Sequence, residues 1–196
     1  MATPAYLKAF KAFLRSRAEF SDLPAMETEF YAGSDRAAVI LQASNVENIL
    51  QGVIEKKMRH PLSNDIRDRL FEGNGPLSTF ANKIMVGYVL ELFGPLFRHD
   101  LDLIRELRNG FAHVRRPMTL TTPEIAEVCK HLKLPDEQSL RVGPQAYYQR
   151  YPDLAVVSDQ SHPRTRFTIT CHTISVRLLE VEQTLLIRVK PPYTLP

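Results

Sequence analysis

No run of apolar residues in this 196-residue sequence approaches the roughly 20 that are needed to cross a bilayer. The sequence has only two cysteines, Cys129 and Cys171, and both fall on positions of apolar periodicity. Small buried thiols are therefore expected rather than a disulfide. The first residues contain no apolar h-region followed by a small-residue cleavage site, which argues against secretion. These absences predict a soluble protein of the reducing cytoplasm without membrane contact.

Signatures of metal and cofactor binding are also missing. No cysteines and histidines have the spacing of zinc ligands, and the sequence has no internal repeat and no long heptad run. The stretch EGNGPLST precedes a predicted helix, but it lacks the lysine and hydroxyl of a phosphate-binding loop. No strand precedes it, as a dinucleotide-binding fingerprint requires. We expect a turn at residues 73–76, no cofactor and no metal.

The sequence is 44% hydrophobic and 24% charged, which is typical of a globular domain with a sizeable core. We expect one domain over residues 1–190 and an exposed tail over 191–196. The formal net charge of +3 is too low for a protein that coats nucleic acid. Basic residues instead gather in short clusters, at Lys56–Arg59, Arg115–Arg116 and Arg164–Arg166.

Helical spacing dominates the first two thirds of the chain. Ser34 is the expected N-cap of a helix whose apolar residues recur in steps of three and four as far as Lys57. The dipeptide His60-Pro61 then stops this helix, because a residue before proline avoids the α region. Two further helices are expected over residues 77–92 and 100–113.

The last third begins with a clear helix start, in which Thr122 is the N-cap and Pro123 the first helical residue. Residues 167–185 are rich in β-branched side chains, and their first positions alternate as a strand would. Their apolar residues nevertheless keep a helical step throughout, which favours a final helix. The fold class predicted is therefore all-α, a helical bundle with a long irregular insertion before the last helix.

Two segments have no single interpretation. Residues 133–165 are punctuated by prolines and exceed an ordinary connection, so they form either a functional flap or a mobile insertion. Residues 6–20 are basic and place their apolar side chains on one helical face. A transit peptide has a similar pattern, although a docking helix is the favoured interpretation.

The stretch LRNGFAHVRR, residues 107–116, contains the strongest candidate for chemistry. At about 100° per residue, Asn109 and His113 share one flank of a helix, whereas Arg108 lies about 140° from His113. The guanidinium of Arg108 and the imidazole of His113 can converge only if the helix loosens at Gly110 or if a symmetric second copy supplies one of them.

Such a convergence would support cleavage of RNA without a metal. His113 would act as general acid and base, Arg108 would hold the phosphate, and Asn109 would orient the reacting groups. The alternative is a helix end stabilised by cationic side chains. Because Arg166 and His172 show a similar spacing on another helix, the spacing alone favours this alternative.

The segment GNGPLSTFANKIMVGYVLELFGPLFRHDLDLIRELRNGFAH resembles the MltR family, which is named for the mannitol operon repressor. RNGFAH also resembles the Arg–polar–His signature of the wider HEPN superfamily of helical bundles, many of which are dimeric RNA-cleaving proteins. The resemblance implies a HEPN-like bundle, a homodimer, and Arg108, Asn109 and His113 as the signature residues. The resemblance assigns no role to Arg115 and Arg116, which are candidates either for contact with nucleic-acid phosphates or for a solvated helix end.

Two functions follow from these patterns. The first is a dimeric MltR-like regulator of transcription that acts through a protein or RNA partner. Direct sequence-specific DNA binding is not expected, because no helix-turn-helix with a credible recognition helix is present. The alternative is a metal-independent endoribonuclease of the HEPN type that uses Arg108, Asn109 and His113.

Overall fold

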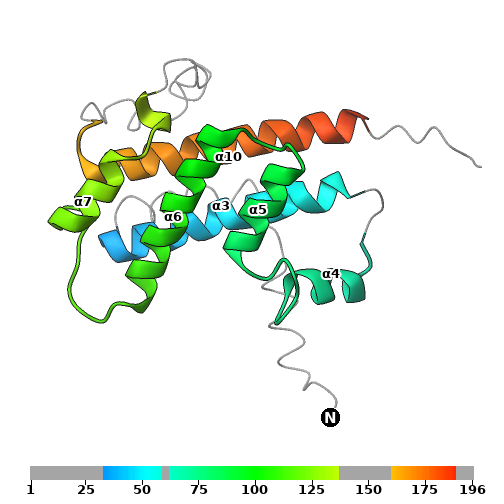
Figure 1. Ribbon diagram of the computed structural model, residues 1–196, viewed down its shortest axis with the longest axis horizontal. Helices are drawn as coiled ribbons and strands as arrows, with labels where there is room; N and C mark the ends of the chain where they lie inside the picture. The colour runs from blue at the N-terminus through cyan, green and yellow to red at the C-terminus, as the bar shows by residue number, and fades with distance from the viewer. Residues whose placement is uncertain (1–32, 59–61, 137–159, 189–196) are drawn as a thin grey trace, which may run out of the picture.

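A computed structural model describes residues 33–58, 62–136 and 160–188, with side chains as far as residue 185. These residues contain six α-helices, one 3-10 helix and no strand, which confirms the all-α prediction (Figure 1). The helices are α3 (Asp35–Lys57), α4 (Asn64–Phe71), α5 (Phe80–Val89), α6 (Pro95–His113), α7 (Pro123–Lys130) and α10 (Pro163–Arg188), and the 3-10 helix is η2 (Leu134–Asp136). No helix among them is both long enough and apolar enough for a membrane span.

The two longest helices, α3 and α10, pack side by side and run in the same direction (Figure 1). Apolar residues of both helices belong to the buried core: on α3 they include Val39, Ala43, Val46, Leu50 and Val53, and on α10 they are Phe167, Cys171, Ile174 and Leu178. Ser34 caps α3 as predicted, since its side chain accepts a hydrogen bond from the Ala37 amide at 3.3 Å. The apolar period of the last segment therefore identified a helix correctly, despite its β-branched residues.

Helices α5 and α6 cover α3 on the side that faces the viewer in Figure 1. The inward face of α6 buries Leu101, Ile104, Leu107 and Phe111. Close packing favours a glycine at position 87, because a Cβ atom there would lie 2.8 Å from the ring of Phe93, which would have to shift.

The ends of α5 and α6 differ from the predicted ranges. Thr79 caps α5 by accepting a hydrogen bond from the Asn82 amide at 3.2 Å, and Glu91 adopts a φ of 56° shortly after its end. Helix α5 is thus shorter than residues 77–92. Helix α6 begins at Pro95 rather than at residue 100, because a proline is favoured in the first turn of a helix.

Two buried charged side chains fix the region that follows α7. The carboxylate of Asp100 is fully buried and accepts hydrogen bonds from the amides of Lys133 and Leu134 at 2.8–3.0 Å. Arg166 donates to the carbonyl of Cys129 at 3.2 Å and to the carboxylate of Asp136 at 2.6 Å. These contacts order the first residues of the segment that we expected to be irregular.

The expected insertion over residues 133–165 is therefore shorter at both ends. Its beginning contains η2, and its last residues belong to α10, which starts at Pro163. Residues 137–159 of the insertion, the amphipathic residues 6–20, the dipeptide His60-Pro61 and the tail 191–196 lie outside the described residues.

Candidate functional site

Arg108 lies on the face of α6 that is directed towards α3 and α5. Its Nη2 atom donates to Oε2 of Glu47 on α3 at 2.6 Å, and its Nη1 atom donates to Oδ1 of Asn109 at 3.1 Å. The guanidinium carbon lies 5.9 Å from the centre of the Phe80 ring on α5, a cation–π distance. Arg108 is therefore engaged on three sides by groups of its own chain.

A second cation shares the carboxylate of Glu47. The ammonium of Lys83 on α5 donates to Oε1 of Glu47 at 2.8 Å, and the Lys83 side chain is only 7% exposed. One carboxylate thus binds two cations that come from two different helices. We name these three residues, Glu47, Lys83 and Arg108, the Glu47 cluster.

The sequence contains a signal for the Glu47 cluster, although neither Glu47 nor Lys83 was among the predicted site residues. Lys83 follows the buried Phe80 by three residues, and Glu47 follows the buried Ala43 by four. Both spacings place a charged residue on the inward face of a helix. A charge on a buried stripe requires a partner of opposite sign, although the spacing cannot identify which one.

His113 is the last residue of α6, and its side chain is exposed. The helix continues unbroken through Gly110, whose carbonyl accepts a hydrogen bond from the Val114 amide at 3.1 Å. Over the described parts of the chain, no hydrogen bond or ion pair joins His113 to Arg108 or Asn109. One chain therefore brings Arg108 and Asn109 together and leaves His113 apart, so only a second copy could complete the constellation.

The connection that follows α6 is tied to the start of α3. The guanidinium of Arg36 donates to the carbonyls of Phe111, Val114 and Arg116, the last two at 3.0 and 3.1 Å. The neighbouring carboxylate of Asp35 accepts from the Leu120 amide at 2.7 Å. The side chains of residues 113–116 are all exposed on this connection.

The second Arg–His pair, Arg166 and His172, is structural. Arg166 is buried and bound to Asp136, and this hydrogen bond raises its already high pKa. Burial lowers the pKa of His172 to about 4, so its imidazole is neutral near pH 7. The expectation that this spacing is structural is therefore supported by the contacts of Arg166 and by the burial of His172.

Neither cysteine has the character of a nucleophile. Both thiols are free and buried, and burial raises the pKa of Cys129 to about 12 and that of Cys171 well above its usual value. Because the thiolate is the reactive form, these residues are inert core side chains near neutral pH. The prediction of small buried thiols is confirmed.

The glycine-containing stretch forms the turn that we predicted. Gly73 has a φ of 58°, a conformation that favours glycine, and a Cβ atom on Gly75 would lie 2.4 Å from the carbonyl oxygen of Leu70. Within the described ranges, no group of three or more His, Cys, Asp and Glu side chains is arranged to hold a metal ion.

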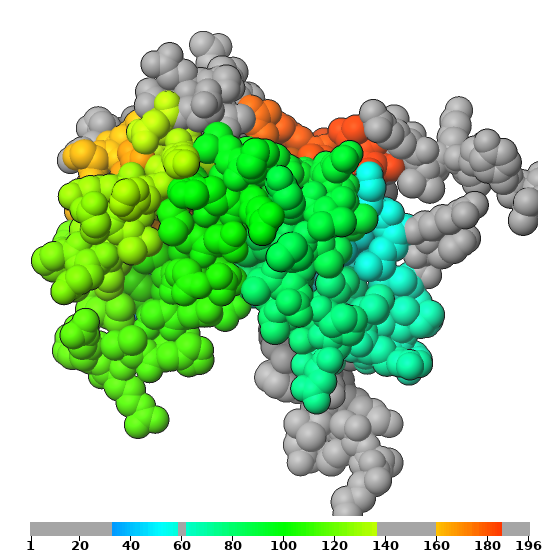
Figure 2. Space-filling view, in the orientation of Figure 1, coloured from blue at the N-terminus to red at the C-terminus, as the bar shows by residue number. Residues whose placement is uncertain are grey.

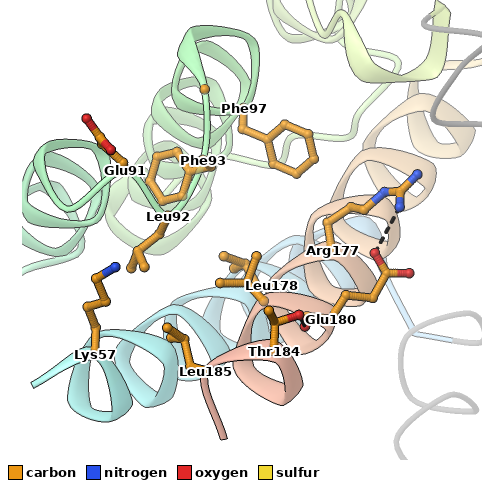
Figure 3. A pocket seen from close by; sticks show the side chains of 12 residues that line it. Lys57, Glu91, Leu92, Phe93, Phe97, Arg177, Leu178, Glu180, Thr184 and Leu185 are labelled. Atoms are coloured by element: carbon orange, nitrogen blue, oxygen red, sulfur yellow. Dashed lines mark hydrogen bonds and ion pairs between the residues drawn. The ribbon is translucent and has the colours of Figure 1, made fainter. Parts of the chain in front are cut away.

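A groove of about 480 Å³ lies between the α5–α6 connection and the second half of α10 (Figure 3). Its apolar lining consists of Leu92, Phe93, Phe97, Leu178, Val181 and Leu185. At its edge Arg177 forms an ion pair with Glu180 at 2.8 Å. Arg108, Asn109 and His113 do not line this groove, so it is separate from the predicted site.

We predict that Glu47→Gln lowers the free energy of unfolding by about 3 kcal/mol, because it leaves two partly or fully buried cations without a carboxylate. The measurement is urea unfolding. Glu180→Gln is the matched control, and it should cost less than about 1 kcal/mol because its ion pair with Arg177 is exposed. Equal costs for the two variants would contradict a central role for Glu47.

The lowered pKa of His172 predicts a loss of stability in mild acid. Between the ordinary pKa of 6.5 and about 4, the unfolded chain binds a proton that the folded chain does not. Stability is therefore greatest above pH 6.5 and falls as the pH drops, by about 2 kcal/mol between pH 7 and pH 5 from this group. His172→Gln should remove that part of the decline, and His131→Gln, at an exposed position, should not. If the free energy of unfolding fell equally between pH 7 and pH 5 in wild type and in His172→Gln, the lowered pKa of His172 would be refuted.

Comparison with models of protein families, with curated proteins and with solved structures finds no match to this chain.

Proposed function

We propose that this chain is a regulator of the MltR type that acts as a homodimer through a protein or RNA partner and does not cut RNA. One observation carries the proposal: the guanidinium of Arg108 is bound to the carboxylate of Glu47 at 2.6 Å. The residue that a nuclease would use to hold phosphate is already neutralised inside the fold.

The energetic consequence follows from the whole Glu47 cluster. For Arg108 to hold a phosphate, its guanidinium would have to exchange a short charge-assisted hydrogen bond with Glu47 for one with the substrate. His113 is the last residue of α6, and its exposed side chain makes no contact with Arg108 in the described parts of the chain. These placements favour a structural role for both signature residues.

A specific observation supports the endoribonuclease as a second candidate. The Arg108 side chain is 26% exposed, its Nε atom is buried without a hydrogen-bond partner, and Asn109 lies beside it. A partner subunit that supplied its own histidine across a two-fold interface would add the missing acid and base. The nuclease therefore needs only a second copy of the chain to complete its site. The proposed regulator needs a second copy and, in addition, a protein or RNA partner.

Two further parts of the proposal rest on indirect support. The sequence contains no helix-turn-helix with a credible recognition helix, so we propose no direct operator binding. The two free thiols agree with a reducing compartment, and we propose the cytoplasm.

We expect RNA to remain intact when it is incubated with a high concentration of the protein in EDTA. Wild type, Arg108→Ala and His113→Ala should give the same result on a denaturing gel, because no acid–base pair is assembled around Arg108. His131→Ala serves as the control for loss of an exposed histidine. Cleavage that disappears in both Arg108→Ala and His113→Ala, but persists in His131→Ala, would establish the nuclease instead.

Light scattering on the purified chain should give the molar mass of two copies at micromolar concentration. The expectation comes from the resemblance to dimeric families rather than from a contact of the single chain. A strict monomer would contradict the proposed assembly and would also remove the route by which His113 reaches Arg108.

A further inference from the structure

We propose that residues 114–116, named here the basic turn, bind the phosphodiester backbone of a nucleic acid. This inference names the partner class of the proposed regulator and rests on that function. It uses Arg115 and Arg116 as the phosphate-binding groups, with Arg36 as the residue that positions them.

Uncompensated positive charge gathers at the basic turn. Most lysines and arginines with described side chains form an ion pair with a carboxylate: Lys56, Arg67, Lys83, Arg98, Arg105, Arg108, Lys130, Arg164, Arg166 and Arg177. Within the same ranges, the cations without such a pair are Arg36, Lys57, Arg69, Arg115, Arg116 and Lys133. Three of these belong to one place, because Arg36 contacts the backbone of the basic turn directly.

The hydrogen-bond partners of Arg36 do not neutralise its positive charge. Its guanidinium donates to carbonyl oxygens, which satisfy its hydrogen bonds without neutralising it. The adjacent carboxylate of Asp35 is bound to Arg164 at 2.9 Å and to the Leu120 amide. The positive potential of the basic turn therefore extends into solvent, where it attracts anions within about 8 Å at physiological salt.

The backbone of the basic turn is held in one conformation while its side chains remain free to bind. Arg36 fixes the carbonyls of Val114 and Arg116, and Asp35 fixes the amide of Leu120 further along. The side chains of Arg115 and Arg116 are exposed on this fixed backbone. A turn that is already ordered loses less entropy when it binds, so its two guanidinium groups are better phosphate ligands than those of a loose tail.

The open shape of the surface favours a polymer over a small anion. The connection from α6 to α7 projects at the lower left edge of the molecule in Figure 2. Arg115 and Arg116 line neither the 480 Å³ groove nor a smaller one of about 190 Å³ between α6 and α7. A strand can lie across such an edge, whereas a small anion needs to be enclosed.

The chemistry also favours nucleic acid over an acidic protein. A guanidinium matches the geometry of a phosphate through two parallel hydrogen bonds. Residues 113–122 contain no tyrosine, tryptophan or phenylalanine, although such residues commonly anchor protein interfaces. Sequence-independent contact with the backbone is therefore the expected mode of binding.

The test is fluorescence anisotropy with a labelled single-stranded RNA of about 20 nucleotides, a length that exceeds the site size of common single-strand-binding folds. Wild type should bind at low salt, and Arg115→Gln/Arg116→Gln should lose at least tenfold in affinity. The slope of log K against log salt should become shallower by about 1.4, since each phosphate contact with a single strand contributes about 0.7. The matched control is Arg69→Gln/Lys133→Gln, which removes the same charge from two other exposed positions and should change affinity less than threefold.

Two further arms identify the source of the phosphate and the nature of the polymer. DNA of the same sequence should bind equally, because the expected contacts are with the phosphates and not with the 2′-hydroxyl. Polyglutamate at equal charge should compete poorly. Effective competition by polyglutamate, absence of RNA binding at low salt, or equal losses in the two double variants would each overturn the inference.

This outcome is separable from that of the proposed function. Arg115→Gln/Arg116→Gln leaves Arg108 and His113 in place, so its effect reports on the basic turn alone. If wild type neither binds nor cuts RNA, the inference about the basic turn is wrong, while the proposal of a regulator is not contradicted. RNA that is cut would reject the regulator whatever the affinity.

Discussion

The carboxylate of Glu47 is the constraint on which the functional interpretation depends. It lies between a nearly buried ammonium on α5 and a guanidinium on α6, and it belongs to the central helix α3. Removing one partner of a buried ion pair is far more costly than the pair itself is stabilising, because the remaining charge is left without compensation. The three helices are therefore coupled through one side chain, and the conformation of Arg108 is fixed by the fold before any partner binds.

Two groups of charged residues in the described ranges have different tasks. Those of the interior, such as Asp100 and Arg166, satisfy backbone groups at the ends of short elements. Those of the basic turn have no carboxylate partner, and the backbone beneath them is fixed by Arg36. The start of α3 thus shapes the exposed edge of the molecule, although 78 residues separate Arg36 from Val114 in sequence.

Apolar periodicity predicted the buried residues more accurately than it predicted the ends of the helices. Leu77 and Leu92 are both buried, as the stripe over residues 77–92 implied, yet both lie outside α5. Burial depends on the side chain, whereas a helix end depends on a local cap and on backbone conformation, here Thr79 and the φ of Glu91. Ser34 and Pro123 were identified correctly because their own chemistry specifies a helix start.

The candidate site shows the same division between local and long-range information. Helical geometry alone indicated that Arg108 and His113 diverge, and α6 continues unbroken through Gly110, which keeps them on different sides. The partner of Arg108 could not be identified in this way, because Glu47 lies 61 residues earlier on another helix. A short motif specifies which side chains are present, whereas the surrounding helices decide whether their charges are free to act. For Arg108 they supply a carboxylate, and for Arg115 and Arg116 they supply only a rigid backbone.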